Sequence, residues 1–196
     1  MRTGQTYYFT IRTTDNATNV STAINSNGQA VAPTLTFGYF SGASITFDVL
    51  NSGNSWTDSA KTTVLRTSTN AYNGYVIKAR AIDELRSPSS FIAHFRNGGL
   101  VPNSAPETWS GTGFGYTTSD SDLIGPGDPD RFTNGGPKYA GWVEDGPGDP
   151  VATNPNVAHT PIVNEDVTIT YRVTGDATTV ASTYATTIVY TCIPQY

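Results

Sequence analysis

The residue types that carry most enzyme chemistry are scarce in this chain and are not grouped by spacing. His94 and His159 lie far apart, and neither has a second ligand at the sequence spacing of a metal site. No serine stands in a nucleophile elbow, and no glycine-rich segment has the pattern of a phosphate-binding loop. The few glutamates are spread along the chain without the arrangement that suggests a glycosidase pair. We therefore predict that the protein is not an enzyme and needs no cofactor.

Aspartates gather in the Gly- and Pro-rich segment that follows residue 119. Asp120, Asp122, Asp128 and Asp130 would supply carboxylate oxygens to a calcium ion if their loops converge. Aspartate beside glycine or proline is also ordinary turn chemistry. The turn role is the favoured interpretation, and a metal site at these four residues is the alternative.

Three tryptophans are candidates for glycan stacking. Trp56, Trp109 and Trp142 each lie near Gly, Ser or Asn, which leaves surface exposure open. An exposed aromatic face can stack on the apolar face of a sugar, whereas a buried ring packs in the core. The sequence leaves both roles open, so surface glycans are kept as possible partners.

The elements that would position these residues are strands. Period-two alternation recurs along the chain, and no 3.6-residue pattern is sustained. Residues 119–161 are predicted to form long Gly/Pro-rich surface loops, from which residues 139–143 return to the core. The predicted strands lie at about residues 34–40, 44–50, 62–68, 74–82, 91–95, 113–117, 166–173 and 184–192.

Composition supports the same fold class. Charged residues make up only 14% of the 196 residues, while Thr, aromatic residues, 19 Gly and 12 Pro favour strands and turns over helices. We predict an all-β protein, a β-sandwich with Greek-key or jelly-roll-like connections. The single cysteine, Cys192, excludes an intrachain disulfide, which leaves a small core residue as the favoured role and an intermolecular disulfide as the alternative.

The N-terminal segment is predicted to be separate from the sandwich. Tyr7, Phe9 and Ile11 would share one face of an extended strand over residues 6–12. The polar tract that follows is rich in turn residues, so we divide the chain into a strand and linker at 1–28 and a sandwich at 29–196. Such a strand either completes the sheet of a neighbouring subunit or pairs within its own sheet.

Charge and hydropathy exclude some classes of partner. The net charge of −5 and an isoelectric point near 4.8 remove the electrostatic attraction on which nucleic-acid binding depends. No apolar run reaches the roughly 18 to 20 residues that a membrane helix needs, so membrane insertion is not expected. Low charge with abundant Thr, Ser, Asn and Gly is typical of exported proteins, and we expect an extracellular or cell-surface location.

Several segments resemble exported bacterial β-sandwich surface proteins. Residues 167–173 and 182–191 look like the closing hairpin of these proteins, and residues 68–77 and 113–120 are similar to other segments of them. The hairpin is also similar, more weakly, to spore-coat-U-like pilins and TasA-type fibre subunits. The resemblance covers about residues 34–191. It implies a sandwich fold and a surface location and, for the fibre proteins, subunits that join through exchanged strands.

These observations favour a structural subunit of an extracellular filament or surface assembly. Copies of the chain would polymerise by donating Tyr7, Phe9 and Ile11 to the sheet edge of a neighbour. The alternatives are a monomeric cell-surface adhesin or carbohydrate-binding module, and a viral capsid or tail protein.

Overall fold

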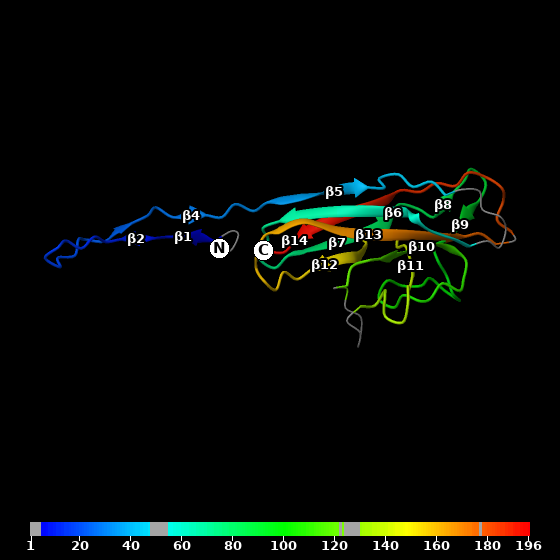
Figure 1. The fold of residues 1–196 in the computed structure, drawn as a ribbon. Helices are drawn as coiled ribbons and strands as arrows, with labels where there is room; N and C mark the ends of the chain where they lie inside the picture. Colours follow the sequence, from blue (N-terminus) through cyan, green and yellow to red (C-terminus); the bar gives the residue numbers. More distant parts are fainter. Residues whose placement is uncertain (1–4, 48–54, 122, 124–129, 177) are drawn as a thin grey trace.

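The computed structural model describes residues 5–47, 55–121, 123, 130–176 and 178–196, with the backbone alone for 55–60. Every regular element among these residues is a β-strand. Two antiparallel sheets pack face to face, and a narrow two-stranded arm projects from one end of them (Figure 1). The prediction of an all-β sandwich is confirmed.

The two sheets contain eight of the strands. The larger sheet has the order β11 (Ala140–Gly141), β10 (Gly113–Thr118), β13 (Ile162–Thr174), β6 (Ser55–Thr69), β5 (Leu35–Ser41). The smaller sheet has the order β12 (Asp149–Asn154), β7 (Tyr75–Ala81), β14 (Ile188–Pro194). A short hairpin of β8 (Leu85–Arg86) and β9 (Phe91–Ile92) lies at the end far from the arm (Figure 1).

Alternation along the strands decides which side chains face the core. In β7, Tyr75, Ile77, Ala79 and Ala81 are all buried and the residues between them are partly exposed. In β13 the buried apolar positions are Val167, Ile169, Tyr171 and Val173, again two residues apart. One face of each strand therefore meets the opposite sheet, as period-two patterning requires.

An aromatic cluster and a hydroxyl network connect the two sheets. The ring of Trp142 stacks on that of Tyr116 with centroids 4.0 Å apart. The Tyr171 hydroxyl lies 2.7 Å from Thr63 Oγ1 on β6 and 2.8 Å from the Tyr190 hydroxyl on β14. Because Tyr171 belongs to the larger sheet and Tyr190 to the smaller one, these bonds hold the sheets in one register.

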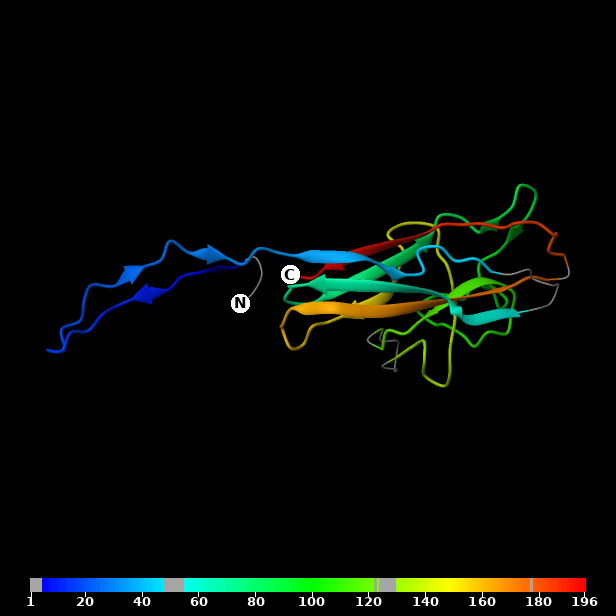
Figure 2. The same ribbon diagram turned by 45° about the horizontal axis from the view of Figure 1, so that its top comes forward.

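The arm consists of four short strands that form one antiparallel hairpin. β1 (Thr6–Tyr7) pairs with β4 (Gln29–Ala30), and β2 (Thr10–Ile11) pairs with β3 (Ile24–Asn25). At its tip, the Asp15 carboxylate accepts hydrogen bonds from the backbone N–H groups of Ala17 and Asn19. Figures 1 and 2 show the arm extending beyond the sandwich, and none of its residues belongs to the core clusters.

The structure differs from the sequence predictions at three places. Residues 24–28, predicted as linker, and residues 29–30, predicted as the start of the sandwich, fold back as the second half of the arm, because they supply backbone partners to the first strand. The predicted loop segment contains β12, which pairs with β7. Residues 44–47 of the predicted strand at 44–50 are not a strand, and residues 48–50 lie outside the described part of the chain.

We expect the hydroxyl network to contribute measurably to stability. Tyr171→Phe removes the shared hydroxyl and leaves the hydroxyls of Thr63 and Tyr190 with one partner fewer in a buried site, which should cost about 1–3 kcal/mol. Tyr184→Phe is the matched control, because the Tyr184 hydroxyl donates to the carbonyl of Val180 in an exposed contact, whose loss should cost about 0.5 kcal/mol or less. Urea unfolding monitored by tryptophan fluorescence measures both. Equal losses in the two variants would contradict the structural role of the network.

Candidate functional site

The arm exposes large apolar side chains on one of its faces. Phe9, Ile11 and Ile24 are 60%, 55% and 73% exposed. Ile11 lies directly opposite Ile24 in the hairpin, so the two side chains are on the same face, and Phe9 shares that face because it lies two residues from Ile11. Tyr7, the third predicted donor residue, is partly buried within the arm. We call Phe9, Ile11 and Ile24 the arm stripe.

The arm stripe combines a predicted pair with a residue that the sequence analysis missed. Phe9 and Ile11 were predicted to be exposed on one face, and the structure brings Ile24 beside them from the tract assigned to the linker. The sequence signal for Ile24 is weak, because it is a single large apolar residue among Ser, Thr and Asn. Its role becomes visible only once the hairpin register is known.

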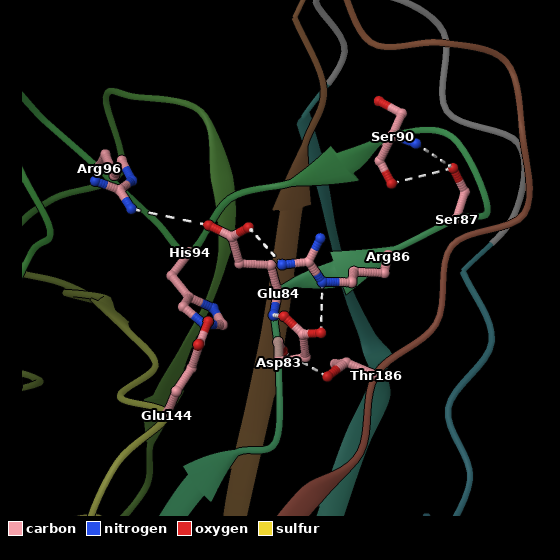
Figure 3. Close-up of polar contacts among 9 residues, drawn as sticks. All are labelled: Asp83, Glu84, Arg86, Ser87, Ser90, His94, Arg96, Glu144 and Thr186. Atoms are coloured by element: carbon pink, nitrogen blue, oxygen red, sulfur yellow. Dashed lines mark hydrogen bonds and ion pairs between the residues drawn. The ribbon is translucent and has the colours of Figure 1, made fainter.

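A hollow near the β8–β9 hairpin is lined by several charged side chains. Among the residues that line this cavity of about 710 Å³ are Glu84, Arg86, His94, Arg96, Glu144 and Trp142. Figure 3 shows these charged groups converging from the hairpin and from the loop that follows Trp142. We call it the His94 cleft.

Polar contacts in the His94 cleft tie three segments of the chain together. The two carboxylate oxygens of Glu84 lie 3.9 Å from guanidinium nitrogens of Arg86 and Arg96 (Figure 3). Asp83 also pairs with Arg86, while its backbone carbonyl accepts a hydrogen bond from Thr186 at 2.6 Å. These pairs fasten the hairpin to the segment that leads into β14. The Glu84 carboxylate therefore has a guanidinium group on each side.

His94 is the buried member of this group. The residue is 4% exposed, its Nε2 lies 2.9 Å from Oε1 of Glu144, and its Nδ1 has no hydrogen-bond partner among the described residues. Burial lowers the pKa of His94, because loss of hydration outweighs the attraction of Glu144. A neutral ring can donate Nε2–H to Glu144, which holds the loop after Trp142 against the hairpin. We assign the cleft a structural role on this geometry.

Trp109 and Trp142, the two tryptophans whose side chains the structure describes, do not come together as a stacking platform. Trp142 is 1% exposed and packs in the core against Tyr116. Trp109 is half-buried, with its ring stacked on Phe95 at 4.0 Å and its indole N–H donating to Thr174 at 2.9 Å. The side chain of Trp56 lies outside the described part of the structure, although its backbone pairs with Val173 in the larger sheet. Core packing therefore accounts for Trp142 and for much of Trp109.

The aspartates of the loop segment are engaged with the chain itself. Asp120 accepts a hydrogen bond from the backbone N–H of Thr153, and Asp130 accepts one from the backbone N–H of Phe132 in the turn that follows it. Asp122 and Asp128 lie outside the described residues. Among those described, no group of three or more potential ligands is placed to hold a metal ion. The Asp130 contacts are local and of the kind that forms a turn, whereas the Asp120 contact joins β12, 33 residues along the chain.

Cys192 packs at the border of the core from β14. Its side chain is partly buried, and burial raises the pKa of its thiol to about 11. The thiol is therefore protonated at neutral pH and is a weak nucleophile.

The described residues contain no helix with the length and hydropathy to cross a membrane.

Comparisons of the chain with protein-family models, curated proteins and solved structures gave no match. The resemblance to exported surface proteins therefore stays a prediction.

The burial of His94 leads to a prediction about pH. Since the folded protein binds a proton at His94 less readily than the unfolded chain, the free energy of unfolding should decrease as pH falls below about 6.5. His94→Gln, whose amide can still donate to Glu144, should show a shallower decrease in urea titrations between about pH 7.5 and 5.5. His159→Gln is the control, because the exposed ring of His159 stacks on Tyr72 at the surface. Identical pH slopes for the wild type and His94→Gln would contradict the assignment.

Proposed function

We propose that this protein is a structural subunit of an extracellular homopolymer in which the N-terminal arm joins neighbouring copies. The observation that carries the proposal is the arm stripe, an apolar face on a projecting hairpin that the protein's own core does not cover. Its partner is another copy of the same chain. The low content of charged residues and the richness in Thr, Ser, Asn and Gly support the extracellular location.

The energetics of a two-stranded ribbon favour docking. An isolated hairpin is at best marginally stable in water, because two strands alone bury little apolar surface. Burying one large aliphatic or aromatic side chain contributes roughly 1.5–3 kcal/mol, and Phe9, Ile11 and Ile24 each have more than half of their surface still to bury. Docking on a neighbour both orders the arm and removes this apolar face from water.

The geometry also allows an open polymer, because the donor and acceptor surfaces of one subunit differ. The arm projects from one end of the sandwich, so a neighbour that receives it on its body presents a different surface from the one it donates (Figure 2). A contact between two unlike surfaces repeats head to tail and produces a filament unless the rotation between copies closes a ring. Each subunit then acts once as donor and once as acceptor.

Replacing the arm stripe by threonine tests this function. The variant Phe9→Thr, Ile11→Thr, Ile24→Thr keeps strand propensity but removes the apolar face, so we expect fibres from the wild type and monomers of 20.9 kDa from the variant. Sedimentation velocity and negative-stain microscopy measure assembly. The melting temperature of the sandwich should not change, since the arm contributes nothing to the core clusters.

Tyr8→Thr is the matched control for this experiment. Tyr8 is also exposed, but it lies one residue from Phe9 and therefore on the other face of the arm. This variant should assemble like the wild type. The proposal fails if the wild type stays monomeric at all concentrations tested, or if the threonine variant assembles as well as the wild type does.

A further inference from the structure

The outer edge of β5 is the least protected sheet edge of the sandwich. β5 has seven residues, with the sequence Leu-Thr-Phe-Gly-Tyr-Phe-Ser, and contains neither a charged residue nor a proline. One side of the strand pairs with β6, and no backbone hydrogen bond is formed on the other side among the described residues. Long, uncharged edges of this kind are the ones that accept another strand.

The other three edges of the two sheets carry features that discourage strand addition. β11 is only two residues long. β12 contains Pro150, which has no N–H to donate, and its register shifts between Pro150 and Ala152. β14 ends in Pro194, and its side chains are mostly half-buried against the sandwich. β5 is therefore the edge on which a further strand meets least obstruction.

The inward face of β5 has the same periodicity as the donor strand of the arm. Leu35, Phe37 and Tyr39 lie opposite Thr69, Thr67 and Leu65, three buried residues of β6, so they share the core-facing side of the sheet. Leu35 remains 39% exposed and Tyr39 51% exposed, because no strand follows β5. A strand added there with Phe9 and Ile11 facing inward would place apolar side chains beside these exposed ones and would close the open side of the sandwich.

The arm does not readily add to β5 of its own subunit, because hydrogen bonds at the base of the arm direct it away from the sandwich. Asn70 donates from Nδ2 to the carbonyl of Ala32 at 2.8 Å and accepts from the N–H of Thr34 at 2.8 Å. These two hydrogen bonds fix the backbone on both sides of residue 33, directly before β5 begins. The arm therefore continues away from the sandwich in both views (Figures 1 and 2).

From these observations we infer that the free edge of β5 in a second copy of this chain is the acceptor of the arm. The strand from Thr6 to Ile11 adds to β5 of the neighbour, with Phe9 and Ile11 turned toward its Leu35, Phe37 and Tyr39. This inference rests on the proposed function and specifies the surface at which the subunits meet.

Disulfide crosslinking locates the acceptor directly. In a Cys192→Ser background, Thr10→Cys on the arm is combined with Thr36→Cys or Gly38→Cys on β5. All three positions lie on faces opposite the apolar ones, and a Cβ atom added at Gly38 has no atom within 4 Å beyond its neighbours in the chain. Thr10→Cys with Thr191→Cys, an exposed position on β14, is the matched control. Assembled samples are oxidised, run on non-reducing gels and imaged by negative-stain microscopy.

A ladder of covalent multimers when Thr10→Cys is combined with either β5 substitution, and none when it is combined with the β14 substitution, would support the inference. A ladder through the β14 position, or dimers from Thr10→Cys alone, would overturn it, because the arm would then dock on another edge or on another arm. Fibres without any of these crosslinks would also overturn it while leaving the proposed function intact. Absence of fibres from the Cys192→Ser parent and from the wild type alike would overturn both.

Discussion

The structure depends on one constraint, the pairing of backbone N–H and C=O groups along both sides of each strand. β13 and β6 satisfy it over their paired length, because each has a neighbour on both sides within the larger sheet. The same constraint explains the arm. Its first strand has no place in either sheet, and the following tract folds back to supply its backbone partners. The sandwich and the arm differ in the burial of their side chains, which is extensive in the sandwich and incomplete in the arm.

Alternation in the sequence was enough to predict the strands whose two faces differ. β7, β13 and β14 were expected because apolar side chains recur at every second residue there. β12 was not predicted, because its buried residues, Val151 and Ala152, are adjacent at a register shift and are preceded by turn signals. One of these signals, Gly148, has a φ of +83°, and a side chain there would strike the carbonyl of Ala79, so glycine lets β12 approach β7.

Site residues could be predicted only where local pattern determines their surroundings. Phe9 and Ile11 were identified because two residues on one strand share a face without reference to any other segment. Ile24 and the partner of His94 depend on contacts that cross the sequence. Glu144 meets His94 from 50 positions away, and this distance in sequence leaves no local signal. The return of residues 139–143 to the core was predicted, but the alternation around Trp142 is too short to show whether its ring lies in the core or on a glycan-binding surface, and the structure places it in the core.

Chain continuity between β5 and the arm has a mechanical consequence for the proposed polymer. Only residues 31–34 separate β4 from β5, and Asn70 holds that connection to the sandwich. A subunit that receives an arm on β5 therefore donates its own arm from the same strand. Force along the polymer would pass from the received arm through lateral hydrogen bonds into β5 and onward along the backbone, without crossing the core. Main-chain hydrogen bonds supply the affinity when a strand adds to a sheet edge, so in the proposed polymer these bonds and the apolar side chains beside them would carry the force together.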